Sequence, residues 1–332
     1  MDTKPWFWIA FNAFVLGMLA LDLGVFHRKA HVIKPKEAAI WTAVWASLSL
    51  LFAAGLFYLE GSQVALTFLT GYVIEQTLSI DNIFVIVMIF AYFGVPAEFQ
   101  HRVLFWGIIG ALVMRGIFIG LGALLLAKFH WIIYVFGALL IYTGIGMALR
   151  KDEEFDAEQN KVLRLARRFL PFTNEYDGQK FFTVRNGVRV GTPLLLVLIM
   201  VEFTDLIFAI DSIPAIFAIT SEPFLVYTSN IFAILGLRSL YFLLAGMVDK
   251  FHLLKYGLAV ILTFVGIKMV IVELYEIPIF ASLGVILGVL ALSIGLSLRF
   301  PAAAKPDENE IEDKTGSLFG APPRRRSSSK NV

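Results

Sequence analysis

The 332-residue sequence contains no cysteine and only five histidines. The absence of cysteine excludes disulfides, zinc sites built on thiolates and thiol redox chemistry. A phosphate-binding loop of the Gly-x4-Gly-Lys-Ser/Thr type is also missing, which argues against pumping driven by ATP. Because no haem, flavin or quinone motif is recognisable, we expect neither an enzyme nor a bound cofactor. The small net charge of +2 gives no indication of nucleic acid binding.

Charged residues are also scarce. They make up 16% of the chain, against 58% hydrophobic residues, whereas soluble domains carry roughly 25% charged residues. The apolar residues gather in nine runs, each about long enough to cross a hydrocarbon core roughly 30 Å thick. The sequence therefore predicts an all-α polytopic membrane protein with about nine transmembrane helices. The expected spans are Trp6–Phe26, Ala38–Tyr58, Val64–Phe93, His101–Ala127, Trp131–Leu149, Thr192–Thr220, Leu225–Val248, Leu253–Val272 and Ile279–Leu298.

The basic residues indicate the orientation of these spans. Of the 28 lysines and arginines, 23 fall in the loops after the first, third, fifth and seventh spans and in the C-terminal tail. Only Lys4 and Lys128 fall on the other side of the membrane. Because loops rich in lysine and arginine stay in the cytoplasm, we expect the N-terminus outside and the C-terminus inside. An odd number of spans agrees with this orientation.

Two segments of the chain are expected outside the transmembrane domain, which covers residues 1–300. The cytoplasmic loop at 150–190 contains Asp156–Phe169, where apolar and basic residues alternate as in a basic amphipathic helix. That helix lies either on the inner leaflet or in solvent as a linker. Residues 301–332 are charged and rich in proline and serine, which is typical of a disordered cytoplasmic tail.

The sequence contains an internal repeat. Glu75-Gln-Thr-Leu-Ser-Ile-Asp81-Asn82-Ile in the third span matches Asp205-Leu-Ile-Phe-Ala-Ile-Asp211-Ser212-Ile in the sixth. The next spans match as well, because the nine residues ending at Arg115 align without a gap on those ending at Arg238. The repeats cover about 64–149, which holds spans 3–5, and about 191–272, which holds spans 6–8. Since each has three crossings, the two are inverted, as in many secondary transporters.

Five acidic and three basic residues fall well inside the spans. Unpaired, these eight would cost on the order of 20 kcal/mol in total, so they must be paired, hydrated or bound to metal. Six helical residues turn through about 600°, so Glu75 and Asp81 do not share a face of a regular helix. Either each acid faces a different neighbour or the helix is broken. Pro214 favours a break in the sixth span.

Carboxylate, amide and hydroxyl oxygens dominate this set, and they suit Mn²⁺, Mg²⁺ or Ca²⁺ better than copper or zinc. If all eight charged groups are ionised, their net charge is −2, which one divalent cation would neutralise. The candidate metal ligands are Glu75, Asp81, Asn82, Glu202, Asp205, Asp211 and Ser212.

The intramembrane cations have two interpretations. Arg115 and Arg238 either pair with acids to hold the bundle together, which we favour, or act directly in transport. Lys268 either does the same or competes with the transported cation. Asp22 lies near the cytoplasmic end of the first span, where it is either hydrated or part of the site. Asn12 is better explained as an interhelical hydrogen-bonding residue than as a ligand.

These motifs resemble the TerC family of membrane proteins, in particular its Alx-type members. The resemblance rests on Glu75-Gln-Thr-Leu-Ser-Ile-Asp81-Asn82 and on Val201-Glu202-Phe-Thr-Asp205-Leu-Ile-Phe-Ala-Ile-Asp211-Ser212-Ile-Pro214, and it extends from about Trp6 to Leu298. It implies a bacterial inner-membrane protein that exports Mn²⁺ from the cytoplasm. The family takes its name from tellurium resistance, and some members are described as redox modulators.

The leading hypothesis is therefore a secondary transporter in which Mn²⁺ binds the acids at the repeat interface and exchanges for protons, since carboxylates can trade a proton for a metal. A membrane-bound redox or stress modulator is the first alternative, and the absence of cysteine argues against it. A scaffold acting through the basic loop and tail is the second.

Overall fold

The computed structural model describes residues 5–21, 33–129, 131–149, 161–185, 187–245 and 253–300. A helix occupies each of the nine expected apolar segments. Asp22, residues 156–160 and the predicted disordered tail at 301–332 lie outside the described residues. The elements are α1 (Pro5–Leu21), α2 (Pro35–Glu60), α3 (Ser62–Tyr92), α4 (Ala97–Lys128), α5 (Ile132–Leu149), α6 (Lys161–Phe169), β1 (Phe182–Arg185), β2 (Val188–Gly191), α7 (Pro193–Phe217), α8 (Pro223–Leu244), α9 (Leu254–Val270) and α10 (Ile279–Arg299).

Seven of these helices, α2, α3, α4, α5, α7, α8 and α10, are long and apolar enough to cross a membrane. Helices α1 and α9 have 17 described residues each, which is at the short end for a crossing. The prediction of a helical, polytopic membrane protein is confirmed. A count of nine crossings stays a prediction.

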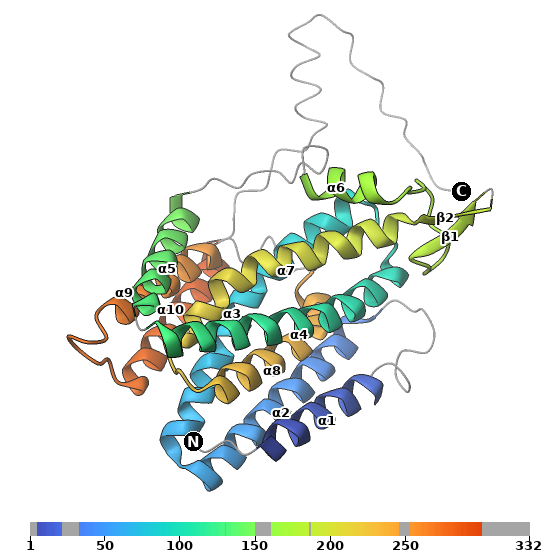
Figure 1. Cartoon of the computed structure of the whole chain (residues 1–332). Helices are drawn as coiled ribbons and strands as arrows, with labels where there is room; N and C mark the ends of the chain where they lie inside the picture. Colours follow the sequence, from blue (N-terminus) through green and yellow to red (C-terminus); the bar gives the residue numbers. More distant parts are fainter. Residues whose placement is uncertain are drawn as a thin grey trace, which may run out of the picture.

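Helices α3, α4, α7 and α8 form the centre of the bundle (Figure 1). Both α3 and α4 pack against α7 and against α8. Helices α1 and α2 cover one side of this group through an aromatic cluster that includes Phe11, Phe52 and Phe232. Helices α5, α9 and α10 cover the other side. Asn12 of α1 accepts a 2.7 Å hydrogen bond from the Tyr227 hydroxyl of α8, so its interhelical role is confirmed.

Glycines bring α5 and α9 into close contact. A Cβ atom on Gly144 would lie 2.8 Å from the carbonyl oxygen of Ala259, and one on Gly266 would lie 2.7 Å from that of Gly137. Small residues let membrane helices approach closely in this way. The two contacts mirror each other, because Gly144 and Gly266 occupy equivalent positions of the repeated Gly-Ile-x-Met segment.

The predicted break at Pro214 is wrong. Helix α7 continues through this proline to Phe217. The other explanation for the spacing of the acids holds for α7, because Asp205 and Asp211 face different neighbours. Asp205 faces α4, whereas Asp211 accepts a 3.0 Å hydrogen bond from Thr143 of α5. The 600° of rotation between them is therefore accommodated in a continuous helix.

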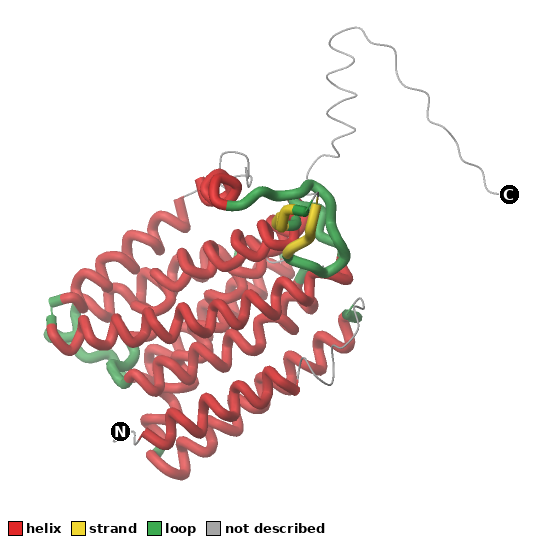
Figure 2. The backbone as a smooth tube through the Cα atoms, turned by 45° about the vertical axis from the view of Figure 1, so that its right-hand side comes forward, coloured by secondary structure: helices red, strands yellow, loops and turns green. Residues whose placement is uncertain are grey.

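The loop between α5 and α7 contains a β-hairpin that the sequence analysis missed (Figure 2). Strands β1 and β2 pair antiparallel, with Phe182 opposite Gly191. Gly187 between them has a φ of +77°, which a glycine adopts without strain. The dipeptide Asn186-Gly187, flanked by β-branched residues, is a strong hairpin signal and could have predicted this turn.

The hairpin and its flanking residues are attached to one end of the bundle, here called the hairpin end, where α3 ends and α4 and α7 begin. The Tyr176 hydroxyl donates a 2.8 Å hydrogen bond to the carbonyl of Phe93, and the guanidinium of Arg102 lies 5.2 Å from the ring centroid of Phe181. A hydrogen bond from Thr183, with further support from Lys180, lowers the pKa of the Asp177 carboxyl in this segment.

Helix α6 lies beside the same end, and its apolar residues divide into two sets. Leu163 is buried in a cluster with residues of α7, whereas Leu165 and Phe169 are 55% and 76% exposed. The amphipathic character of the helix is thus confirmed over Lys161–Phe169. Its contact with the inner leaflet stays a prediction, as does the solvated alternative.

Candidate cation site

Arg115 lies at the centre of the bundle, where four helices meet. Its Nη1 atom forms an ion pair with Glu75 of α3 and donates a 2.8 Å hydrogen bond to the side-chain oxygen of Asn230 on α8. Its Nη2 atom lies 3.1 Å from a carboxylate oxygen of Asp205 on α7. A further contact of 3.3 Å joins Nη1 to the hydroxyl of Ser212. One arginine thus connects both repeats through residues of α3, α4, α7 and α8.

The Glu75–Arg115 pair in this cluster is inaccessible to solvent. Glu75 has no exposed surface and Arg115 is 1% exposed. Removing one partner from a buried pair of this kind typically costs about 3–5 kcal/mol, because the other charge is left uncompensated. The favoured interpretation of Arg115 as a structural partner of the acids therefore agrees with its contacts.

Several oxygens in the cluster have no hydrogen-bond donor. These are Oε2 of Glu75, Oδ2 of Asp205 and Oδ1 of Asn82. Asn82 is joined to Asp205 through its amide nitrogen, which donates a 3.4 Å hydrogen bond to the other carboxylate oxygen. Buried acceptors are normally satisfied by a donor, a water or an ion. Carboxylate and amide oxygens are the atom types that a hard cation prefers as ligands.

The second acid of each repeat lines a cavity next to Arg115. Asp81 and Asp211 line this cavity of about 40 Å³, together with Glu75, Met147 of α5 and Leu262 of α9. Asn82 and Ser212 lie on its wall as well. Because it receives the same pair of positions from each repeat, the cavity lies where the two repeats meet.

Glu202 lies about one helical turn before Asp205 on α7. Its carboxylate is directed at Gly110 of α4, so closely that a Cβ atom at Gly110 would overlap it. The sequence analysis placed Glu202 among the ligands but did not identify Gly110 as its neighbour. The absence of a side chain at Gly110 is what makes room for the carboxylate.

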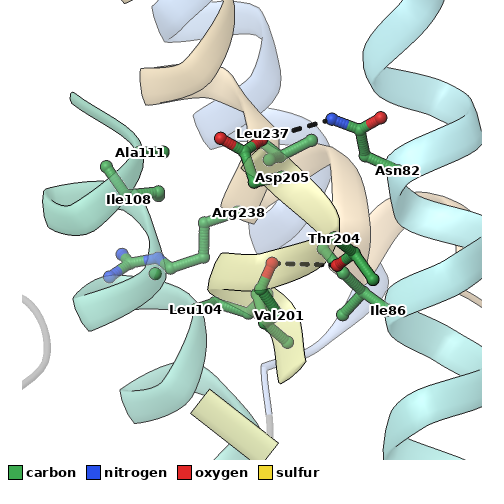
Figure 3. Close-up of a pocket in the computed structure, with 11 residues that line it drawn as sticks. Asn82, Ile86, Leu104, Ile108, Ala111, Val201, Thr204, Asp205, Leu237 and Arg238 are labelled. Carbon is green, nitrogen blue, oxygen red and sulfur yellow. Dashed lines mark hydrogen bonds between the residues drawn. The ribbon is translucent and has the colours of Figure 1, made fainter. Parts of the chain in front are cut away.

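The remaining predicted cations occupy separate places. The Lys268 ammonium donates a 3.1 Å hydrogen bond to the hydroxyl of Ser282 on α10. Arg238 lines a second cavity, together with Asn82 and Asp205. Figure 3 shows its side chain extending past Leu104 and Ile108 of α4, with the guanidinium pointing away from Asp205.

Across the described ranges, no three histidine, aspartate or glutamate side chains converge as a group that could hold a metal ion. The seven predicted ligands are instead divided among the Arg115 cluster, the adjacent cavity and the surface of α4. A cation bound by Glu75 and Asp205 would therefore rely on neutral oxygens as well, such as that of Asn82.

Two further contacts were absent from the sequence analysis. Asn230 supports Arg115, and Thr143 supports Asp211. Asn230 was part of the repeat alignment, in which it is aligned with Gly107. A polar residue in an apolar span is by itself a common packing feature, so this position gave no further indication. Thr143 carries no signal in the sequence, because threonine in a helix usually bonds its own backbone.

The comparisons with known proteins agree on one family. The profile described as "Integral membrane protein TerC family" matches residues 60–305. An uncharacterised membrane protein of Myxococcus xanthus is 56% identical over 295 residues, covering 89% of this chain and 92% of that protein. A protein of Escherichia coli K12 named "Putative membrane-bound redox modulator Alx" is 52% identical over 298 residues, covering 87% and 93%. A membrane protein of Rickettsia bellii is 43% identical over 291 residues, covering 88% and 96%.

No solved structure matches this chain. The profile covers the third to the last expected span, including both copies of the repeated acidic motif, and the relatives are similar over nearly their whole length. The chain therefore belongs to the TerC family of integral membrane proteins.

Proposed function

We propose that this protein is a secondary transporter that exports a divalent cation, Mn²⁺, from the cytoplasm through the acidic cluster at the centre of its bundle. The observation that carries the proposal is the buried group of Glu75, Asp205 and Asn82, in which three oxygens have no donor. Buried carboxylates in a membrane domain are costly and are usually functional. Mn²⁺ accepts carboxylate, amide and hydroxyl oxygens.

The packing of the helices supports an inverted repeat. An axis that exchanges the two repeats would exchange α3 with α7, α4 with α8 and α5 with α9. Such an axis requires that α3 pack on α8 as α7 packs on α4, and both pairs are in contact. It also requires that Gly144 and Gly266 meet equivalent residues, as they do. Inverted repeats are the architecture in which a central site opens alternately to the two sides.

The four acids of the repeated motif lie around the region where α3 and α7 pack together. Helix α3 runs toward the hairpin end and α7 runs away from it. Asn82, next to Asp81, is bonded to Asp205, and Ser212, next to Asp211, contacts Arg115 beside Glu75. Glu75, Asp81 and Asp211 also line one cavity, so a cation there would have several carboxylates within reach.

The hairpin end would face the cytoplasm, because the most basic loop of the chain belongs to it. This orientation puts the N-terminus outside and the C-terminus inside a bacterial inner membrane. Mn²⁺ would then enter from the hairpin end and leave on the opposite side. Protons would exchange at Asp81 and Asp211, the two carboxylates that line the cavity, so that a released cation is replaced without stranding charge in the membrane.

The experiment measures cellular manganese by elemental analysis in Mn²⁺-challenged bacteria that lack their own exporter. Wild type is expected to lower the manganese content, and Asp81→Asn and Asp211→Asn are expected to abolish this effect at equal membrane abundance. Asp307→Asn, in the C-terminal tail, is the matched control and should behave as wild type. Wild-type protein that leaves manganese unchanged, or Asn variants as active as wild type, would refute export through these acids.

A redox role is the second candidate, and the name of the Escherichia coli relative favours it. Since the chain has no cysteine, electron transfer would require a bound cofactor. The visible absorption spectrum of the purified protein distinguishes the two candidates. A chromophore that changes on addition of dithionite would support the redox role, whereas export sensitive to Asp81→Asn would support transport.

A further inference from the structure

The two repeats carry arginines at equivalent positions, yet the side chains occupy unlike surroundings. Arg115 reaches the central carboxylates and forms an ion pair with each of them. Arg238 extends instead along α4, beside Leu104 and Ile108, and points away from Asp205 (Figure 3). An exact two-fold arrangement would give both arginines the same contacts. The bundle is therefore asymmetric at the point where the repeats share their acids.

Arg115 occupies the place of a cation. Its guanidinium is permanently charged, and it contacts one oxygen of Glu75 and one of Asp205, while the other oxygens of both remain without donors. A metal ion bound between these carboxylates would repel Arg115 strongly at low dielectric. Arg115 and a divalent cation thus compete for the same two acids.

Arg238 of the second repeat can compete with a divalent cation in the same way. Arg238 lines the cavity that also contains Asp205 and Asn82. Rotation of the Arg238 side chain away from α4 and into this cavity would bring its guanidinium close to Asp205, the acid of the same repeat. In an inverted repeat, the outward-facing and inward-facing states arise when the two halves exchange conformations. The exchange would therefore convert the observed arrangement into one with Arg238 at the acids and Arg115 withdrawn.

We propose that Arg115 and Arg238 alternate as tethered counter-ions of Glu75 and Asp205 in the empty carrier, one in each of its two orientations. This inference rests on the proposed function. The loaded carrier needs neither arginine, because the bound cation neutralises the same carboxylates. The empty carrier needs both, because its return to the cytoplasmic side passes through each orientation in turn.

Measurements of net flux and of exchange flux distinguish the counter-ion role of the arginines from a purely structural role. Net flux requires the empty carrier to return, whereas exchange of Mn²⁺ for Mn²⁺ requires only the loaded carrier to move. Purified full-length protein is reconstituted in liposomes, and radioactive Mn²⁺ is followed first into manganese-free liposomes and then into liposomes holding the same concentration of unlabelled Mn²⁺. The variants are Arg115→Gln and Arg238→Gln. Arg164→Gln, on the exposed side of α6, is the control.

For both variants we expect net flux to fall by between about 150-fold and about 5,000-fold, the range that corresponds to leaving a buried charge without its partner. Exchange should remain near the wild-type rate in both. The control should match wild type in both assays. Retained exchange also demonstrates that the variant protein is folded.

Three outcomes would overturn the inference. Parallel loss of net flux and exchange in correctly folded protein would mean that the arginines act only structurally. Wild-type net flux in Arg238→Gln would exclude alternation, and this variant leaves the contacts of Arg115 intact, so it remains informative if Arg115→Gln does not fold. Wild-type net flux in Arg115→Gln would exclude the counter-ion role. Failure of the proposed function itself is distinguishable, because wild-type protein would then show neither flux.

Discussion

The close contact between α5 and α9 offers a sharp test of the repeat packing. Gly144 of α5 faces the backbone of α9, where a Cβ atom would meet the Ala259 carbonyl oxygen at 2.8 Å and the Thr263 amide nitrogen at 3.0 Å. Real Cβ atoms essentially never approach that closely, and backbone atoms cannot rotate away. The substitution Gly144→Ala must therefore push α5 and α9 apart. Gly146, two residues along the same helix, has no atom within 4 Å of the same position.

The magnitude follows from the difference between these two sites. Replacement of glycine by alanine favours a helix by about 1 kcal/mol at either position, so this contribution cancels in the comparison. Overpacking at Gly144 costs about 1–3 kcal/mol. We expect Gly144→Ala to be less stable than Gly146→Ala by that amount, which corresponds to a lower Tm by roughly 1–4 °C for a chain of 332 residues.

The assay is thermal unfolding in detergent, followed by circular dichroism at a helical wavelength. Gly266→Ala provides an internal replicate, since its Cβ atom would lie 2.7 Å from the Gly137 carbonyl oxygen on the opposite helix. Both interface variants should lose a similar amount of stability if the repeats pack symmetrically. Equal Tm values for Gly144→Ala and Gly146→Ala would refute the close contact. Loss in only one of the two interface variants would refute the symmetry.

Two further predictions concern the site and the hairpin end. Gly110→Ala should displace the Glu202 carboxylate, which is the flexible end of a side chain. Mn²⁺ flux in liposomes should therefore fall several-fold, while the Tm changes little. Unchanged flux would show that the position of Glu202 does not matter for transport. The pKa of Asp177 is lowered by its hydrogen bond from Thr183 and by Lys180. Its stabilising effect is therefore complete above the ordinary carboxyl pKa of about 3.9 and is lost as the pH falls through the lowered value. The rate of hydrogen exchange of the 177–192 segment, corrected for the intrinsic rate, should increase on acidification in wild type. In Asp177→Asn this pH dependence should be lost. The same pH dependence in both proteins would show that Asp177 does not stabilise the segment.

Much of the architecture could be predicted because it depends on local patterns. Each apolar run became a helix, since backbone groups in lipid must be satisfied within their own segment. The repeat alignment also paired the two segments that form α5 and α9. The hairpin was missed because its strands are only four residues long and lie in a loop that was interpreted by its charge.

The sequence by itself determined the helical membrane class, the family and which acids and arginines lie inside the apolar segments. Only the tertiary structure decided how these charges are grouped. Arg115 meets Asp205 from a distance of 90 residues along the chain, and Glu202 lies against Gly110 instead of joining them. The physical reason is that helical periodicity determines the direction of a side chain relative to its own helix, whereas its partner depends on how neighbouring helices are rotated and which repeat they come from.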